Sequence, residues 1–121
     1  MKKILVVDDY REIRELVTTT LTLRDYQIFQ AESGEAAIGV AKAEKPDLII
    51  MDITMPGSID GLEAARMIKD DPDTENCKII MLTGMGQDTY RKQGLEAGAD
   101  DYFVKPFSPL ALLNKVEETL G

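Results

Sequence analysis

The chain contains no histidine, no tryptophan and only one cysteine among its 121 residues. The lack of histidine excludes the Ser-His and Cys-His nucleophile systems and most zinc sites. The single cysteine, Cys77, cannot form an intrachain disulfide, which fits a reducing compartment. Any acid, base or metal chemistry must therefore use carboxylates, lysine, hydroxyl groups and the backbone.

Positive charge and long hydrophobic runs are also scarce. Fourteen Lys and Arg against 22 Asp and Glu give a net charge of −8, so we expect no direct nucleic acid binding by this chain. The opening "MKKILVV" is too short for a signal peptide, and no stretch approaches the roughly 20 apolar residues of a membrane span. We expect a cytoplasmic protein without membrane contact, folded as one domain over residues 1–121.

Five short apolar runs alternate with five helical patterns along the chain. Several runs are continuously apolar, as in strands that are buried on both faces. The predicted strands span 3–7, 26–30, 47–51, 78–82 and 101–104. The predicted helices span 11–24, 34–45, 60–70, 87–97 and a final segment that begins at Pro109. The alternation predicts a flavodoxin-like, doubly wound α/β fold: a five-stranded parallel sheet in the order 2-1-3-4-5 with helices on both faces.

Local signals support the helix boundaries. Ser33 and Ser108 are predicted to cap the helices that follow them. In the first helix, the spacing of the apolar residues predicts an inward face that includes Leu16. The weakest pattern is 87–97, which has few apolar residues and contains Gly94.

Polar residues follow the central strands. In an open sheet of this order, ligands bind beyond the carboxyl ends of strands 1 and 3, where the order reverses. The residues at these strand ends are Asp8 and Asp9, Asp52, Thr83 and Gly84, and Lys105. Strand order therefore predicts that three carboxylates, a hydroxyl and an ammonium group share one pocket.

This combination of groups indicates phosphoryl chemistry. Three neighbouring carboxylates do not all stay ionised cheaply unless a cation is present, and an all-oxygen site favours Mg²⁺ or Mn²⁺ over Zn²⁺. Lys105 and Thr83 could contact phosphate oxygens, and the small Gly84 would leave room beside them. An aspartate can itself be the nucleophile, and Asp52, alone at the end of a central strand, is the best candidate.

The segments "ILVVDD", "LIIMDITMP…DG", "IIMLTG" and "GADDYFVKPF" resemble the receiver domain of two-component response regulators, including the chemotaxis regulators. The resemblance runs from about Lys3 to Leu120. It implies that Asp52 accepts a phosphoryl group from a phosphohistidine on a sensor histidine kinase or a phosphotransfer protein. It also implies a Mg²⁺ site, with Mn²⁺ as a substitute, formed by Asp8, Asp9, Asp52 and the main-chain carbonyl of Thr54.

The resemblance further implies a switch. Lys105 would contact the phosphoryl group, Thr83 would turn to hydrogen-bond it, and Tyr102 would turn inward. The peptide bond before Pro106 would be cis. The signal would leave through the face formed by helix 4, strand 5 and helix 5, toward a downstream target or output domain.

Homodimerisation on activation is a further implication. The segment "GLEAGADDYFVKPFSP" is similar to receivers of the winged-helix transcription-factor class, which pair through the same face. The charges that could serve in such pairing are Arg91, Glu96, Asp100, Asp101 and Lys115.

One departure from the family pattern lies in the loop after Asp52. Receivers usually have three steps from the proline to the acidic residue before the glycine, whereas Pro56 to Asp60 is four steps. The Gly57–Ile59 segment thus carries one extra residue, and we expect an altered loop before the third helix.

The sequence is also compatible with other functions. A Mg²⁺-dependent phosphatase with an aspartyl nucleophile, of the haloacid-dehalogenase type, needs a second acid two residues after the nucleophile, where this chain has Thr54. A degenerate receiver that only binds partners is opposed by the complete set of site residues. We expect a signalling module rather than an enzyme, one that takes part in its own phosphorylation and slow dephosphorylation. The sequence leaves open whether it stands alone or is the N-terminal part of a longer regulator.

Overall fold

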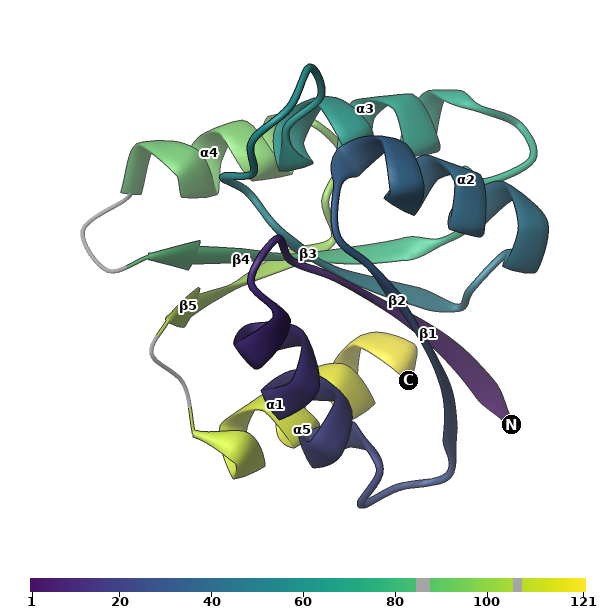
Figure 1. The fold of residues 1–121 in the computed structure, drawn as a ribbon, viewed down its shortest axis with the longest axis vertical. Helices are drawn as coiled ribbons and strands as arrows, with labels where there is room; N and C mark the ends of the chain where they lie inside the picture. Colours follow the sequence, from purple (N-terminus) through teal and green to yellow (C-terminus); the bar gives the residue numbers. More distant parts are fainter. Residues whose placement is uncertain (85–87, 106–107) are drawn as a thin grey trace.

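The computed structural model describes residues 1–84, 88–105 and 108–121, and for residues 88–91 it describes the backbone alone. Strands and helices alternate throughout the described chain: β1 Lys2–Val7, α1 Arg11–Leu21, β2 Tyr26–Ala31, α2 Gly34–Glu44, β3 Leu48–Asp52, α3 Gly61–Asp70, β4 Lys78–Gly84, α4 Asp88–Glu96, β5 Asp101–Lys105 and α5 Pro109–Leu120. All the strand pairs are parallel, in the order β2-β1-β3-β4-β5, which confirms the predicted fold. Helices α2, α3 and α4 cover one face of the sheet, and α1 and α5 cover the other (Figure 1).

The sheet separates two hydrophobic cores, which is why its central strands are continuously apolar. Successive side chains of a strand point to opposite faces, so each central strand contributes to both cores. The core beneath α2, α3 and α4 contains Leu5, Val7, Ile49, Met51, Ile79 and Met81. The core beneath α1 and α5 contains Ile4, Val6, Leu48, Ile50, Ile80 and Leu82. Burial of each such Ile, Leu, Val or Met side chain contributes roughly 1.5–3 kcal/mol to stability.

The predicted helix caps are present. Ser33 Oγ accepts a hydrogen bond from Ala36 N at 3.1 Å at the start of α2, and Ser108 Oγ accepts one from Ala111 N at 3.1 Å at the start of α5. Asp60 caps α3 by accepting from Glu63 N at 2.9 Å. These side chains satisfy backbone donors that have no partner within a helix.

Two predictions about α1 are wrong. The helix ends at Leu21 rather than at residue 24, because the following residues form tight turns in which Arg24 N donates to the Leu21 carbonyl. Leu16 is 46% exposed rather than inward-facing. Thr20 is buried on this helix, and its hydroxyl donates to the Leu16 carbonyl at 2.8 Å.

The register of the sheet aligns the carboxyl ends of the central strands. Val7 pairs with Met51, and Asp52, the last residue of β3, pairs with Leu82. Gly84 pairs with Lys105 at the ends of β4 and β5. The polar residues at these positions therefore lie along one edge of the sheet. Among the residues that the structure describes, none of the helices has the length and apolar character needed to cross a membrane.

Candidate functional site

The carboxylates of Asp8, Asp9 and Asp52 form a cluster at this edge. Each offers one oxygen, and these oxygens all lie within 4.8 Å of one another. Asp8 is fully buried and Asp52 is only 6% exposed, while Asp9 is half-buried. Because β1 and β3 are neighbours in the sheet, the structure brings together residues from two distant parts of the sequence.

Asp8 is held through every one of its polar groups. Its N–H donates to the Ala31 carbonyl at 3.2 Å, and its own carbonyl accepts from Arg14 Nη1 at 2.7 Å. Its Oδ1 accepts from Tyr10 N at 2.9 Å, and its Oδ2 accepts from Lys105 Nζ at 3.4 Å. The end of β1 is thus fixed by the backbone of β2, by α1 and by β5.

Lys105 lies between two of the carboxylates. Its ammonium donates to Asp52 Oδ1 at 3.1 Å and to Asp8 Oδ2 at 3.4 Å. Burial would lower the pKa of Lys105, but the charges of Asp52 and Asp8 outweigh this effect, and the pKa is raised. The lysine therefore stays charged and partly compensates the cluster.

One lysine does not compensate three carboxylates. Burial, followed by the negative charge of Asp8, raises the pKa of Asp52 from 3.8 to about 6, although Lys105 acts in the opposite direction. Burial also raises the pKa of Asp8. The site therefore favours either a proton or a second cation.

Asp9 provides a separate observation that fits a metal ion. Its Oδ1 is buried, and no hydrogen-bond donor reaches it from the described part of the chain. A buried carboxylate oxygen without a partner is destabilising unless a cation or water satisfies it. The three carboxylates, with oxygen donors only, fit a hard divalent cation.

An open pocket of about 320 Å³ gives access to the cluster. It is lined by Asp9, Tyr10, Asp52, Thr54, Pro56, Gly84 and Lys105. Thr83 is buried, and its hydroxyl donates to the Gly84 carbonyl at 3.2 Å. Of the two residues predicted at the end of β4, Gly84 therefore lines the pocket, and Thr83 bonds to the main chain beside it.

The residues predicted to transmit the signal lie away from the pocket, at the amino end of β5, just before it, and on α4 and α5. Tyr102 is half-buried and packs against the core beneath α2, α3 and α4. Asp101 Oδ2 accepts from Lys115 Nζ at 3.1 Å, so these two charges pair within the chain. Asp100 Oδ2 accepts from Lys69 Nζ at 3.1 Å and from Ile79 N at 2.8 Å. Three of the five charges predicted for homodimer pairing are thus already bonded within this chain.

The remaining predicted positions differ in what the structure describes. Glu96 is exposed at the end of α4. The side chain of Arg91 and the peptide bond at Pro106 lie outside the described residues.

The loop that carries the extra residue is held by α2. Glu35 Oε1 accepts from Ile59 N at 3.0 Å and from Ser58 Oγ at 3.2 Å. The base of the loop is closed by a hydrogen bond from Gly61 N to the Ile53 carbonyl at 2.9 Å. The loop for which an altered path is predicted is thus hydrogen-bonded to the first turn of α2.

Sequence reasoning missed Arg14 and Glu35. Both are polar residues in the first turns of helices, where such residues are common, and neither belongs to a recognisable motif. Arg14 contacts the backbone of Asp8 across the turn between β1 and α1, and Glu35 contacts the backbone of Ile59, which is distant in the sequence. The sequence signal that could have pointed to Arg14 is its position, one turn into the helix that follows Asp8 and Asp9.

Comparison with known proteins gives consistent matches across the chain. The sequence profile described as "Response regulator receiver domain" matches residues 4–117. The phosphate regulon transcriptional regulatory protein PhoB of Pseudomonas aeruginosa is 44% identical over 119 residues, covering 98% of this chain and 52% of that protein. The transcriptional regulatory protein ResD of Bacillus subtilis is 46% identical over 118 residues, covering 98% and 48%. The chain thus spans about half the length of these curated relatives.

Solved structures agree in fold over nearly their whole length. The chemotaxis response regulator CheY4 of Vibrio cholerae superimposes with a TM-score of 0.91 at 32% identity, covering 98% of both chains. The receiver domain of NtrX from Brucella abortus gives a TM-score of 0.90 at 30% identity, covering 97% of both chains. With its fold, its acidic cluster and these matches, the chain belongs to the response regulator receiver domain family.

Proposed function

We propose that Asp52 is the phosphoacceptor of this receiver and takes the phosphoryl group from a phosphohistidine of a sensor histidine kinase or phosphotransfer protein. The observation that carries the assignment is the position of Asp52 within the cluster. It both lines the open pocket and contacts the Lys105 ammonium, whereas Asp8 is fully buried and does not line the pocket, and the ion pairs of Lys105 are with Asp8 and Asp52 among the described residues. An incoming phosphoryl group would therefore meet the Asp52 nucleophile and the Lys105 ammonium together.

The chemistry is a direct transfer. An ionised Asp52 oxygen attacks phosphorus, a P–O bond forms, and the P–N bond to the donor imidazole breaks. The imidazole nitrogen keeps the electron pair of that bond and takes up a proton. Because the pKa of Asp52 is about 6, most of the carboxylate is ionised at neutral pH. Lys105 is placed to neutralise an oxygen of the transferred group.

The proposal includes a Mg²⁺ site, for which Mn²⁺ would substitute. The carboxylates of Asp8, Asp9 and Asp52 would hold the ion, together with the carbonyl of Thr54, which lines the same pocket. When bound, the ion would neutralise charge on the phosphoryl oxygens. The buried Oδ1 of Asp9, which no donor from the described residues reaches, supports this site.

The output is proposed to run through Thr83, Tyr102 and the face formed by α4, β5 and α5. Phosphorylation adds roughly −1.5 to −2 charge beside Lys105, which would draw the Thr83 hydroxyl away from the Gly84 carbonyl. The Asp101–Lys115 pair lies on this face, so a homodimer would either keep the pair intact or exchange it for contacts between chains. The transcriptional regulators that it resembles are about twice as long, which supports an output domain as the next partner; a separate target is the alternative. A cytoplasmic location stays a prediction.

Acetyl phosphate as a small phosphodonor tests the assignment. We expect intact-protein mass spectrometry to show one added phosphoryl group in the presence of Mg²⁺ and none after chelation with EDTA. Asp52→Asn should abolish the adduct, while Asp25→Asn, at an exposed position in the turn before β2, should retain it. Repeated turnover of a phosphoester without an adduct would instead favour a phosphatase and would refute the receiver assignment.

A further inference from the structure

Arg14 makes an unusual contact for a residue in the first turns of a helix. Its side chain is half-buried and reaches back to the end of β1, where Nη1 donates to the Asp8 carbonyl at 2.7 Å. Its Nε donates to Gln30 Oε1 at 3.2 Å near the end of β2. The guanidinium thus ties α1 to the ends of two strands.

The contact bears directly on the orientation of Asp9. The carbonyl of Asp8 and the N–H of Asp9 belong to one planar peptide unit, so fixing that oxygen limits the direction in which Asp9 leaves the strand. No donor from the described residues reaches the buried Asp9 Oδ1. The backbone is therefore a main determinant of where this carboxylate points.

We propose that Arg14 is a positioning residue for the divalent cation: it fixes the Asp8–Asp9 peptide so that the Asp9 carboxylate faces Asp8 and Asp52. This inference rests on the proposed metal site. A lysine does not replace the arginine, because the planar guanidinium presents two donors in a fixed fork, toward Asp8 and Gln30.

Geometry and charge predict opposite effects on metal affinity. The positive charge of Arg14 by itself repels a cation in the neighbouring cluster, so its removal would tighten binding if charge dominated. Loss of the hydrogen bond to the Asp8 carbonyl would loosen Asp9 and weaken binding. Residues that orient metal ligands in this way typically change affinity about 10- to 100-fold.

The test measures the dissociation constant for Mn²⁺ directly, by the electron paramagnetic resonance signal of the free ion, with Mg²⁺ added as competitor. Arg14→Lys keeps the charge and loses the fork, and Arg14→Met loses both. We expect both variants to bind Mn²⁺ roughly tenfold more weakly. Circular dichroism and measurement well below the unfolding temperature restrict the comparison to folded protein. If Arg14 only stabilises the fold and does not position Asp9, the dissociation constant for Mn²⁺ stays unchanged in the folded variants.

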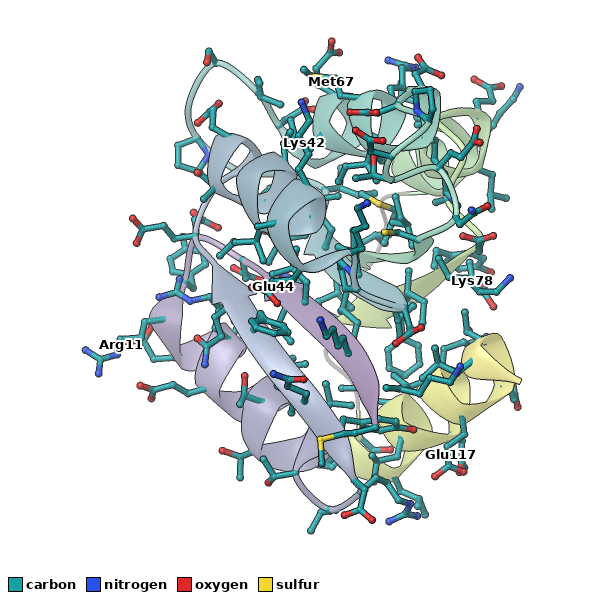
Figure 2. All side chains as sticks on the ribbon, turned by 90° about the vertical axis from the view of Figure 1, so that its right-hand side faces the viewer. Arg11, Lys42, Glu44, Met67, Lys78 and Glu117 are labelled. Carbon is teal, nitrogen blue, oxygen red and sulfur yellow. The ribbon has the colours of Figure 1, made fainter. Side chains whose placement is uncertain are left out.

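Arg11 supplies the matched control. It lies on the same helix, its side chain is 78% exposed and paired with Glu15 at 2.8 Å, and Figure 2 shows it extending from the edge of the molecule. Arg11→Met should bind Mn²⁺ like the unmodified protein.

Each outcome separates the inference from the function on which it rests. Unchanged Mn²⁺ binding in both Arg14 variants, with binding lost in Asp9→Asn, would overturn the positioning role and leave the metal site intact. Tighter binding in Arg14→Met with no change in Arg14→Lys would also overturn it, because charge alone would then act. If the unmodified protein binds no Mn²⁺ that depends on Asp9, both the metal site and the role of Arg14 fail.

Discussion

Replacing Asp52 with asparagine should stabilise the metal-free protein at neutral and alkaline pH. Asparagine has nearly the same shape as aspartate and stays neutral, so it mimics the protonated carboxyl at every pH. The pKa of Asp52 is raised from 3.8 to about 6 by burial and by the Asp8 charge. A rise of about two pH units corresponds to roughly 3 kcal/mol of destabilisation by the ionised form.

The sign of the pH dependence follows from which state holds the proton. Between pH 4 and 6 the folded chain keeps a proton on Asp52 that the unfolded chain has already lost. The free energy of unfolding contributed by this group therefore falls as pH rises through that window, and the full penalty applies above it. Asp52→Asn should match the unmodified protein near pH 4 and exceed it in stability by up to roughly 3 kcal/mol at pH 8.

Urea unfolding in EDTA at several pH values measures this difference. For a domain of this size, roughly 3 kcal/mol displaces the unfolding midpoint by about 1–2 M urea. Asp25→Asn, which removes an exposed carboxylate outside the site, controls for the loss of one negative charge. An Asp52→Asn variant that is no more stable than the unmodified protein at pH 8 would refute the reasoning.

Mg²⁺ supplies a second arm of the same experiment. At a hundred times its dissociation constant, a ligand that binds only the folded state adds about 2.7 kcal/mol. The unmodified protein should gain this stability, and Asp52→Asn should gain less because it lacks one of the proposed ligands. The advantage of the variant should therefore shrink when Mg²⁺ is present.

Two further predictions concern the loop after β3. A Cβ on Gly61 would overlap the Asp52 carbonyl oxygen, so Gly61→Ala should lower the free energy of unfolding in urea by roughly 3 kcal/mol or more. Gly39 lies within α2 with open space around a Cβ, so Gly39→Ala should raise the free energy of unfolding by about 0.5–1 kcal/mol. Equal effects of the two substitutions would contradict the close approach at Gly61. Glu35→Ala removes the acceptor for Ile59 N and should lower the free energy of unfolding by about 1 kcal/mol. Glu35→Gln keeps a side-chain oxygen and should recover part of this loss. An unchanged unfolding midpoint in Glu35→Ala would contradict the role of this contact.

The fold was predictable because two independent patterns agree. Continuous apolar runs indicate strands buried on both faces, and their alternation with helices leaves few topologies. The helix at 88–96 was the weakest prediction, because its packing depends on the near absence of a side chain. A Cβ on Gly94 would lie 3.3 Å from Met81 Cγ, so the glycine lets the helix approach β4, and hydrophobic periodicity does not register such a contact. The prediction that Leu16 faces inward was wrong because periodicity gives the direction of the buried face of a helix but not how wide that face is.

The cluster at the strand ends was predictable for a different reason. Parallel strands end at the same edge of the sheet, so a residue type at each strand end can be assigned to a shared location before any contact is known. Arg14 and Glu35 act otherwise, by reaching backbone groups of other segments. Sequence shows the donors and acceptors that side chains carry, but not which distant carbonyl or amide lacks a partner in the fold.

The repulsion among the three carboxylates connects these observations. A well-packed apolar residue in place of Asp8 or Asp52 would avoid the cost of burying these charges, and the pKa of Asp52 reflects that cost. Lys105 offsets part of the cost through its ion pairs with Asp8 and Asp52, and no donor from the described chain reaches Asp9 Oδ1. A site that an added positive charge stabilises binds a cation strongly for the same reason that it is costly without one. The energetic defect of the metal-free fold and its proposed capacity to bind Mg²⁺ are therefore one property of the same three side chains.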